Sequence, residues 1–399
     1  MGLVGKDNKH ILKEAAKFVI LLGVVSLFAD MTYEGARSIT GPYLSILGAS
    51  GTIVGIIAGL GELAGYGLRL ISGYISDRTG KYWAVTISGY VMNLFAVPLL
   101  ALAGRVDIAI ILIILERVGK GVRTPARDAM LSHATAQMGR GWGFGVHEAL
   151  DQIGAILGPL TVAAVLYFEG SYQVSFAVLL VPALLALSVL ARSRFLYPRP
   201  RAFEEDRAKP QSREFPKVFW LYLVAVALIA AGFVDFSLAA FHFKEAAVVS
   251  DDLIPIFYAV AMGVDALAAL LFGRLFDRVG MPILIAATVI SLFCVPLVFM
   301  GNFYFALLGI ALWGVGMGAQ ESIMRATIAG MVSIDRRGSA YGIFNTGYGV
   351  FWFLGSALMG MLYDVSIPAL ITFSVAAQLA SIPILLLVRK KIPTPSTLK

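Results

Sequence analysis

Charged residues are scarce in this sequence. Only 14% of its 399 residues are Asp, Glu, Lys or Arg, whereas 58% are hydrophobic. Soluble globular proteins carry charge at about a quarter of their positions. The composition therefore excludes a soluble protein and predicts an integral membrane protein, in agreement with a mean hydropathy of +0.81.

Metal-binding and catalytic patterns are also missing. The single cysteine, Cys294, cannot form an intramolecular disulfide and is expected to be a small core residue. No Cys/His ligand spacing, nucleophile elbow or phosphate-binding loop occurs. The four histidines lie on separate segments, at His10, His133, His147 and His242. The sequence therefore predicts no metal, no cofactor, no ATP-driven step and no enzyme activity.

Long apolar runs are what the sequence does contain. A bilayer span needs about 20 mostly apolar residues, and these runs are too long and too continuous for barrel strands. Charged and Pro/Gly breaks divide the chain into twelve predicted transmembrane helices, at residues 17–47, 51–76, 84–104, 107–132, 142–168, 171–192, 218–245, 252–276, 281–300, 303–331, 338–364 and 366–388. We expect an all-α polytopic membrane protein.

Lysine and arginine are concentrated in alternate connections. The connections on the opposite side hold little beyond Arg105 and Lys244. Basic loops are retained in the cytoplasm, so we expect a multi-pass protein of the inner (plasma) membrane with both termini cytoplasmic. This bias explains the net charge of +7, and no nucleic-acid partner is required.

The two halves of the chain look like copies of one another. The stretch Gly73–Gly80 contains a Gly-x-x-x-Asp-Arg-x-Gly pattern that recurs at Gly273–Gly280, and Leu157–Gly158 matches Leu354–Gly355. Internal repeats of this kind are typical of transporters. We therefore predict an N-terminal six-helix bundle (residues 1–192), a basic cytoplasmic linker (193–217) and a C-terminal six-helix bundle (218–399).

Three motifs resemble those of the major facilitator superfamily. Gly73–Trp83 is similar to the signature between its second and third helices, and Leu115–Gly121 resembles its fourth-helix signature, with Lys120 in place of the usual glutamine. Gly154–Pro159 is similar to the Gly-Pro element of proton-coupled drug and metabolite antiporters, although the full pattern of closely spaced glycines is absent. The resemblance implies two pseudo-symmetric six-helix bundles that work by alternating access.

The first of these motifs is interpreted as a gate. Its glycines permit close helix approach and a tight reversal, and its charges can make contacts that break when the transporter changes state. Retention of basic loops in the cytoplasm explains Arg78 and Lys81 but neither Asp77 nor the glycines. The predicted gate residues, with two from the fourth helix, are Gly73, Asp77, Arg78, Gly80, Lys81, Arg127 and Asp128.

Charges within apolar helices are candidates for function because they are costly in a bilayer. Asp30, Glu34 and Arg37 follow i, i+4, i+7 spacing and share one helix face. Either this is a protonatable site controlled by Arg37, or it is a self-neutralising structural triad. We interpret Asp30, Glu34, Glu62 and Asp151 as candidate proton-coupling groups.

Aromatic and polar side chains on several helices form the predicted substrate site. A stripe of this type can stack against an apolar or planar ligand, although ordinary helix packing is the alternative. The predicted substrate-binding residues are Arg37, Tyr66, Arg117, Glu148, Asp235, Trp313, Tyr341, Asn345, Tyr348 and Trp352.

These observations predict a monomeric secondary active transporter driven by the proton gradient. We expect an antiporter for multidrug-type efflux, with protons, a small amphipathic or drug-like compound and the lipid bilayer as its only partners. Two alternatives stay open at this point. The arginines also suit a proton-coupled symporter or exchanger of an organic anion, and twelve helices also suit a lipid flippase.

Overall fold

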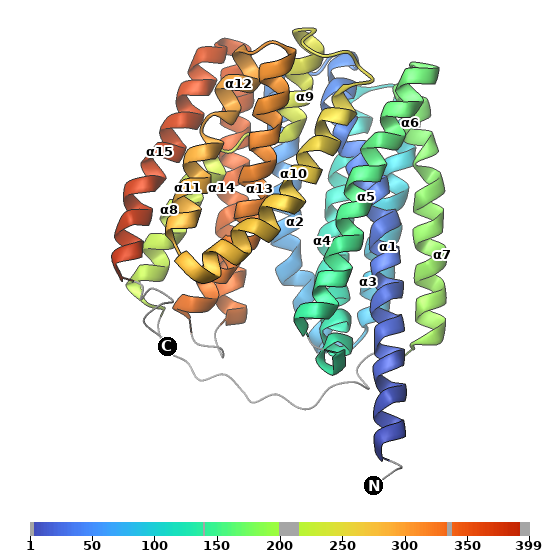
Figure 1. Cartoon of the computed structure of the whole chain (residues 1–399). Coiled ribbons are helices and arrows are strands. Elements are labelled where there is room, and N and C mark those ends of the chain that lie inside the picture. The colour runs from blue at the N-terminus through green and yellow to red at the C-terminus, as the bar shows by residue number, and fades with distance from the viewer. Residues whose placement is uncertain (1–3, 139, 199–214, 333–336, 392–399) are drawn as a thin grey trace. The chain divides into compact units, whose positions relative to one another are not determined.

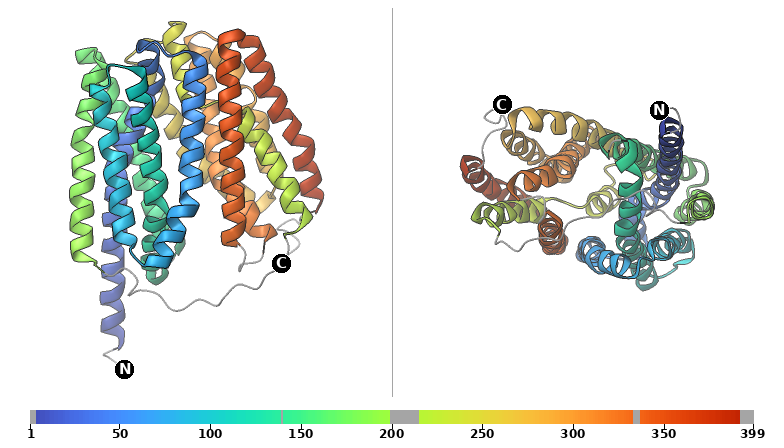
Figure 2. Two further views of the ribbon diagram at one scale, coloured as in Figure 1. Left: turned by 180° about the vertical axis from the view of Figure 1, so that it is seen from behind. Right: turned by 90° about the horizontal axis from the view of Figure 1, so that it is seen from below.

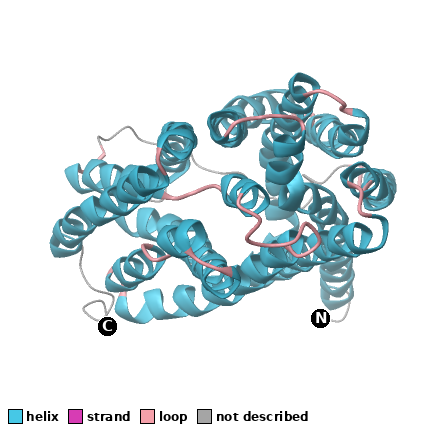
Figure 3. Cartoon of the chain, turned by 90° about the horizontal axis from the view of Figure 1, so that it is seen from above, coloured by secondary structure: helices cyan, strands magenta, loops and turns pink. Residues whose placement is uncertain are grey.

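The computed structural model describes residues 4–138, 140–198, 215–332 and 337–391 (Figure 1). Nearly all of this part is helical, and no strand occurs in it (Figure 3). Residues 199–214 of the predicted linker lie outside the described residues.

The first half of the chain contains seven α-helices and one short 3₁₀ helix, η1 (Leu100–Leu102). The α-helices are α1 (Val4–Ile46), α2 (Gly51–Thr79), α3 (Tyr82–Leu99), α4 (Val106–Met138), α5 (Arg140–Glu169), α6 (Tyr172–Val178) and α7 (Leu180–Leu196). The second half contains α8 (Lys217–Gly232), α9 (Phe236–Glu245), α10 (Ile254–Val279), α11 (Pro282–Ser291), α12 (Cys294–Met300), α13 (Phe303–Met331), α14 (Arg337–Val365) and α15 (Ile367–Lys391).

Eleven helical segments in the described part of the chain are long and apolar enough to cross a membrane. The remaining long helix, α4, has 33 residues and contains several charged side chains. The twelve-helix all-α fold is thus confirmed. Three predicted helices are interrupted in the structure, between α6 and α7, between α8 and α9, and between α11 and α12.

The charged motif at Gly73 is mostly helical rather than a loop. Helix α2 continues to Thr79, and only Gly80 and Lys81 separate it from α3. Gly80 has φ 68°, and Gly280, which follows α10, has φ 77°. Glycine adopts such angles without the steric cost that a side chain incurs. The two copies of the motif therefore end their helices in the same way.

Two compact units are present. Among the described residues, one unit contains those in 1–36 and 67–208, and the other those in 37–66 and 209–399. Helices α1 and α2 thus contribute to both. Within the first unit α3 packs on α4 and α4 on α5 (Figure 2). Within the second unit α10 packs on α13, and α8 packs on α14 and α15.

The sequence repeat is also a packing repeat. A β-carbon added at Gly158 of α5 would lie 2.3 Å from the main-chain oxygen of Met31 in α1. At the matching position of α14, a β-carbon on Gly355 would lie 2.1 Å from the main-chain oxygen of Ala231 in α8. Both helix pairs therefore touch backbone to backbone, an approach that requires glycine.

Candidate functional site

A buried arginine pairs with two carboxylates in the second unit. The Nη2 atom of Arg37 on α1 lies 3.2 Å from Oε1 of Glu62 on α2 and 3.0 Å from Oδ2 of Asp235. Arg37 is 9% exposed and Asp235 2% exposed. Charge-assisted hydrogen bonds of this kind are the strong ones in proteins, and burial excludes the water that would weaken them.

Asp235 owes its position to the interruption between α8 and α9. Its backbone is extended and it caps α9, because Oδ1 accepts a hydrogen bond of 2.8 Å from the main-chain nitrogen of Ser237. The indole nitrogen of Trp313 donates to the oxygen of Val234 at 2.8 Å and supports the interrupted backbone. Interrupted helices often form binding sites in transporters because they expose polar backbone groups inside the membrane. Trp313 is fully buried, so its role here is to hold the interruption.

An aromatic cluster adjoins this ion-pair site. Tyr66 lies one turn after Glu62 on α2, and its ring meets the ring of Tyr348 on α14 edge to face at 5.5 Å. The hydroxyl of Tyr348 donates to Oε1 of Gln320 on α13 at 2.9 Å. The ring of Trp352 lies 5.5 Å from that of Tyr348 at an interplanar angle of 43°, and Trp352 is 3% exposed. The structure therefore brings three of the predicted substrate residues together beside Glu62.

Two other predicted substrate residues on α14 are half-buried. The hydroxyl of Tyr341 donates to the main-chain oxygen of Arg325 at 3.3 Å, and Asn345 lies on the following turn. Sequence reasoning missed two residues of the aromatic cluster, Gln320 and Phe233. The centre of the Phe233 ring lies 5.7 Å from that of Trp313 and 5.6 Å from that of Trp352. Neither carries a charge or belongs to a recognised motif, so no signal in the sequence distinguished them.

A second polar cluster lies in the first unit. The hydroxyl of Tyr33 donates to Oδ1 of Asp30 at 2.5 Å. The ammonium group of Lys120 on α4 lies 3.4 Å from Oε1 of Glu34 and 4.0 Å from the centre of the Tyr33 ring. Two predicted coupling carboxylates are therefore adjacent to a lysine that sequence reasoning had noted only as a departure from a motif.

Two neighbouring charges on α4, Glu116 and Arg117, form an ion pair. Arg117 lies 3.1 Å from Oε2 of Glu116, and the side-chain amide of Asn93 on α3 donates to Oε1 of the same glutamate at 2.7 Å. Arg117, a predicted substrate residue, thus has a neighbouring counter-charge on its own helix.

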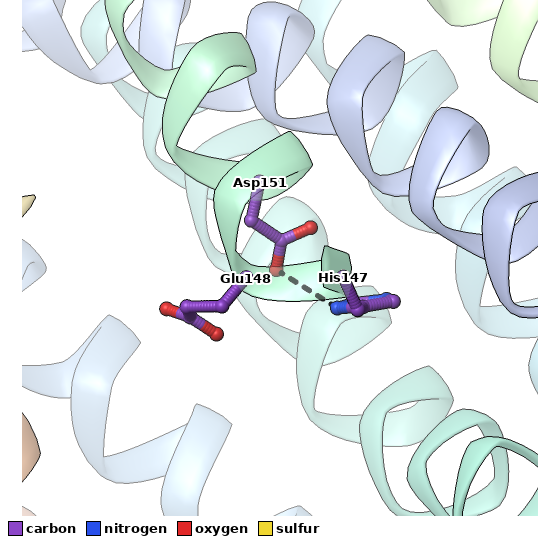
Figure 4. Close-up of side chains that lie close together, drawn as sticks. All are labelled: His147, Glu148 and Asp151. Atoms are coloured by element: carbon purple, nitrogen blue, oxygen red, sulfur yellow. Dashed lines mark ion pairs between the residues drawn. The ribbon is translucent and has the colours of Figure 1, made fainter. Parts of the chain in front are cut away.

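Three potential ligands lie close together on α5 (Figure 4). Ligand atoms of His147, Glu148 and Asp151 are all within 4.8 Å of one another, and Nδ1 of His147 is 3.7 Å from Oδ2 of Asp151. Nε2 of His147 lies 3.1 Å from the Ser26 hydroxyl, which also accepts from Arg127 at 3.2 Å. A divalent cation held by these three residues would be repelled by this neighbouring guanidinium.

Three predicted gate residues, Asp77, Arg78 and Asp128, contact side chains on α3 or on their own helix. Oδ1 of Asp77 accepts from the hydroxyl of Tyr82 at 2.9 Å, and Arg78 donates to the hydroxyl of Tyr74 at 2.8 Å. Asp128 pairs with its sequence neighbour Arg127 at 2.8 Å. Arg78 and Asp128 thus each make their contact within a single helix.

The remaining gate residues mark the ends of the motif. A β-carbon on Gly73 would lie 3.4 Å from Pro125 of α4, which is ordinary van der Waals distance. Gly80 provides the positive φ at the reversal, and Lys81 after it is exposed.

Comparison with known proteins identifies the family. The sequence profile described as Major Facilitator Superfamily matches residues 22–355 and 236–399 of this chain. The chain belongs to the Major Facilitator Superfamily. It is 43% identical to an uncharacterised protein of Mycobacterium tuberculosis over 96% of this chain and 95% of that protein. It is also 30% identical to a multidrug resistance protein, MdtH, of Proteus mirabilis, over only 32% of each chain.

Solved structures show the same fold. The crystal structure of the nucleoside transporter NupG matches with a TM-score of 0.72 and 15% identity, over 94% of this chain and 98% of that one. The protein is therefore a multi-pass membrane transporter of the superfamily that acts on a small-molecule substrate, and it is not an enzyme.

Proposed function

We propose that this transporter exports a small amphipathic compound in exchange for protons, with Arg37, Glu62 and Asp235 as the coupling centre. The observation that carries the proposal is that one buried guanidinium lies between two carboxylates. We further propose a monomer in the plasma (inner) membrane with both termini in the cytoplasm, as the distribution of basic residues favours.

The ion-pair site links proton binding to a structural change. Arg37 and Glu62 belong to the first sequence repeat, whereas Asp235 belongs to the second. Protonation of either carboxylate removes one of the charges that Arg37 contacts and weakens the pair. A proton that arrives at this centre therefore loosens a contact between the two repeats, which alternating access requires.

The same site favours a cationic or neutral amphipathic substrate. One guanidinium faces two carboxylates, so a positively charged group can replace either Arg37 or a proton at this centre. The rings of Tyr66, Tyr348 and Trp352 supply an apolar surface beside it. The similarity to a multidrug resistance protein supports this class of substrate.

The proton gradient supplies enough energy for such transport. One proton moving down 100 mV yields about 2.3 kcal/mol, and one pH unit adds about 1.4 kcal/mol. Together these support a concentration gradient of roughly several hundredfold for a neutral compound exchanged for one proton, whereas electroneutral exchange of a monovalent cation is driven by the pH difference alone, about tenfold per unit.

The proposal is tested in proteoliposomes with an acidic lumen. The panel consists of ethidium as the cation, carboxyfluorescein as the anion and uridine as the neutral compound. We expect ethidium to accumulate and the accumulation to stop when the gradient is collapsed. Asp235→Asn should slow the initial rate by about tenfold or more, equivalent to about 1.4 kcal/mol, whereas Asp277→Asn, at an exposed acid on α10, should behave like the parent.

Two results would contradict the proposal. One is that no compound of the panel responds to the pH gradient. The other is that Asp235→Asn and Asp277→Asn transport equally well. Accumulation of carboxyfluorescein when the lumen is alkaline would identify the organic-anion alternative.

A further inference from the structure

Arg123 of α4 is buried in the first unit without a carboxylate in direct contact. Its side chain is fully shielded, and the guanidinium carbon lies 4.3 Å from the centre of the Tyr90 ring and 5.5 Å from that of Tyr33. Contact with aromatic faces compensates only part of the cost of burying a cation. A purely structural arginine at such a depth would normally have its hydrogen-bond donors satisfied.

Several buried polar atoms in this part of the first unit have no hydrogen-bond partner. Two of them are donors, the Nε and Nη1 atoms of Arg123. One is an acceptor, Oδ1 of Asp151 on α5, and another is the hydroxyl oxygen of Tyr90. The donors and the acceptor are complementary in charge. They behave like the two parts of an ion pair that is not formed in this state of the protein.

Asp30 lies within the same cluster. Helix α5 crosses α1 closely at this point, since a β-carbon on Gly154 would lie 3.0 Å from Cβ of Asp30. The charged groups that act on the Asp30 carboxylate come from three helices: Glu34 of α1, Lys120 and Arg123 of α4, and Asp151 of α5. Asp151 lies one turn before Gly154 on α5, so the two carboxylates belong to facing stretches of two closely packed helices.

We propose that Asp30 and Asp151 share one proton and that Arg123 is the positioning charge that turns towards whichever carboxylate is ionised. Like charges at close range disfavour double ionisation, so one of the two acids retains a proton. The inference rests on the proposed proton coupling, and it adds a proton-binding site in the first unit that is separate from the Arg37 centre.

The remaining titratable groups set the surroundings of this pair. Tyr33 donates to Asp30 and fixes one of its oxygens. His147 lies 3.7 Å from Oδ2 of Asp151, on the side away from the unpartnered Oδ1. Arg127 of α4 pairs with Asp128. Lys120 pairs with Glu34 at 3.4 Å, whereas Nε and Nη1 of Arg123 have no partner and are available to the pair.

The test uses the complete chain in lipid vesicles and needs no substrate. Infrared difference spectra between successive pH values report protonation of carboxyl groups directly. We expect a carboxyl band that titrates in the parent protein and whose midpoint moves to lower pH in Asp30→Asn, because Asp151 then no longer has an anion beside it. Arg123→Gln should move its midpoint to higher pH by on the order of one unit, and Arg123→Lys should restore most of the shift.

A second variant keeps the test decisive if Arg123→Gln fails to fold. Asp151→Asn removes an anion beside Asp30 and should move the midpoint to lower pH, opposite to the effect of Arg123→Gln. Arg105→Gln, which removes an exposed cation paired with Asp107, should leave the midpoint unchanged. Opposite shifts from two neighbours would not result from general loosening of the bundle.

The proposal is overturned if the band in Asp30→Asn titrates with the midpoint of the parent, or if the midpoint is the same in Arg123→Gln and Asp151→Asn as in the parent. The proposed function is tested separately, because it is measured by transport and not by the infrared titration. A band that titrates and shifts as expected, in vesicles that show no gradient-driven flux, would support the shared-proton site and contradict the proposed export.

Discussion

Arg37 and Asp235 are 198 positions apart in the sequence, and their side chains lie 3.0 Å apart in the structure. Glu62 contacts the same guanidinium nitrogen at 3.2 Å. The three residues come from α1, α2 and the interruption between α8 and α9. A single arginine thus connects the two sequence repeats through charges that a proton can neutralise.

The first prediction concerns the free energy of this ion pair. Arg37→Met leaves two buried carboxylates without their cation, and removal of one partner from a buried pair costs about 3–5 kcal/mol. Adding Asp235→Asn to the same chain should recover part of the loss, because the unpaired charge is then removed. Denaturant unfolding in detergent should therefore show a non-additive double-mutant cycle, with an interaction of about 1–3 kcal/mol. Strictly additive effects would show that Arg37 and Asp235 are energetically independent.

The second prediction concerns the contact between α2 and α14 in the second unit. A β-carbon on Gly55 would lie 2.3 Å from the main-chain oxygen of Ser356, so Gly55→Ala must push the helices apart. We expect a lower Tm by several degrees, since overpacking costs about 1–3 kcal/mol. Gly67→Ala on the same helix is the matched control, because no atom lies within 4 Å of its added β-carbon. That variant should be as stable as the parent or slightly more stable. Equal Tm values for the two variants would contradict the contact.

The third prediction concerns the first turn of α2. The main-chain amides of Gly51 and Thr52 donate to the carboxylate of Asp364 at 2.9 and 2.8 Å. Asp364 lies in the last turn of α14. Asp364→Ala removes this cap and should cost about 0.5–2 kcal/mol. Asp364→Asn keeps an acceptor but loses the charge that favours a helix N-terminus, so its effect should be smaller. Hydrogen exchange of the two amides should accelerate most in Asp364→Ala and remain unchanged in Asp277→Ala.

The fourth prediction concerns alkaline pH. Tyr197, just beyond α7, donates to Oε2 of Glu14 at 2.8 Å. Partial burial, the hydrogen bond to Glu14 and the charge of that carboxylate raise the pKa of Tyr197 from 10.0 to about 12. A raised tyrosine pKa means that the folded state favours the neutral hydroxyl. The stabilisation is therefore complete below pH 10 and is lost as the pH rises towards 12.

Thermal unfolding of the parent and Tyr197→Phe across this pH range checks the prediction. The parent should have the higher Tm below pH 10, and the difference should vanish near pH 12. The main-chain oxygen of residue 197, which accepts from the Trp83 indole at 2.9 Å, is retained in Tyr197→Phe and is not affected. A Tm difference that is constant with pH would contradict the role of the hydroxyl.

The arrangement of helices was accessible from the sequence because apolar length is a local property. A chain must satisfy its backbone hydrogen bonds within each span in lipid, so each long apolar run becomes a helix. The repeat was also visible, since Gly158 and Gly355 are needed at matching helix crossings. The interruption at Phe233–Asp235 was not predicted, because the apolar run continues through it and only the contacts of Trp313 and Arg37 explain why the helix stops.

The functional pairs were only partly predictable. Asp30, Glu34 and Arg37 do share a face of α1, but seven residues of helix rise by about 10 Å. Side chains at the two ends of such a stripe can therefore contact different partners. In the structure Asp30 is hydrogen-bonded to Tyr33, while Arg37 pairs with Glu62 and Asp235.

The sequence by itself determined the membrane setting, the twelve helices, the repeat and the set of charges that must be buried in lipid. Only the tertiary structure decided which of these charges meet. Spacing along one helix fixes the direction in which a side chain points, but the partner that it reaches comes from another helix, whose position depends on packing across the whole unit. Arg37 and Arg123 are both buried arginines in apolar helices, yet one lies between two carboxylates and the other between two tyrosine rings.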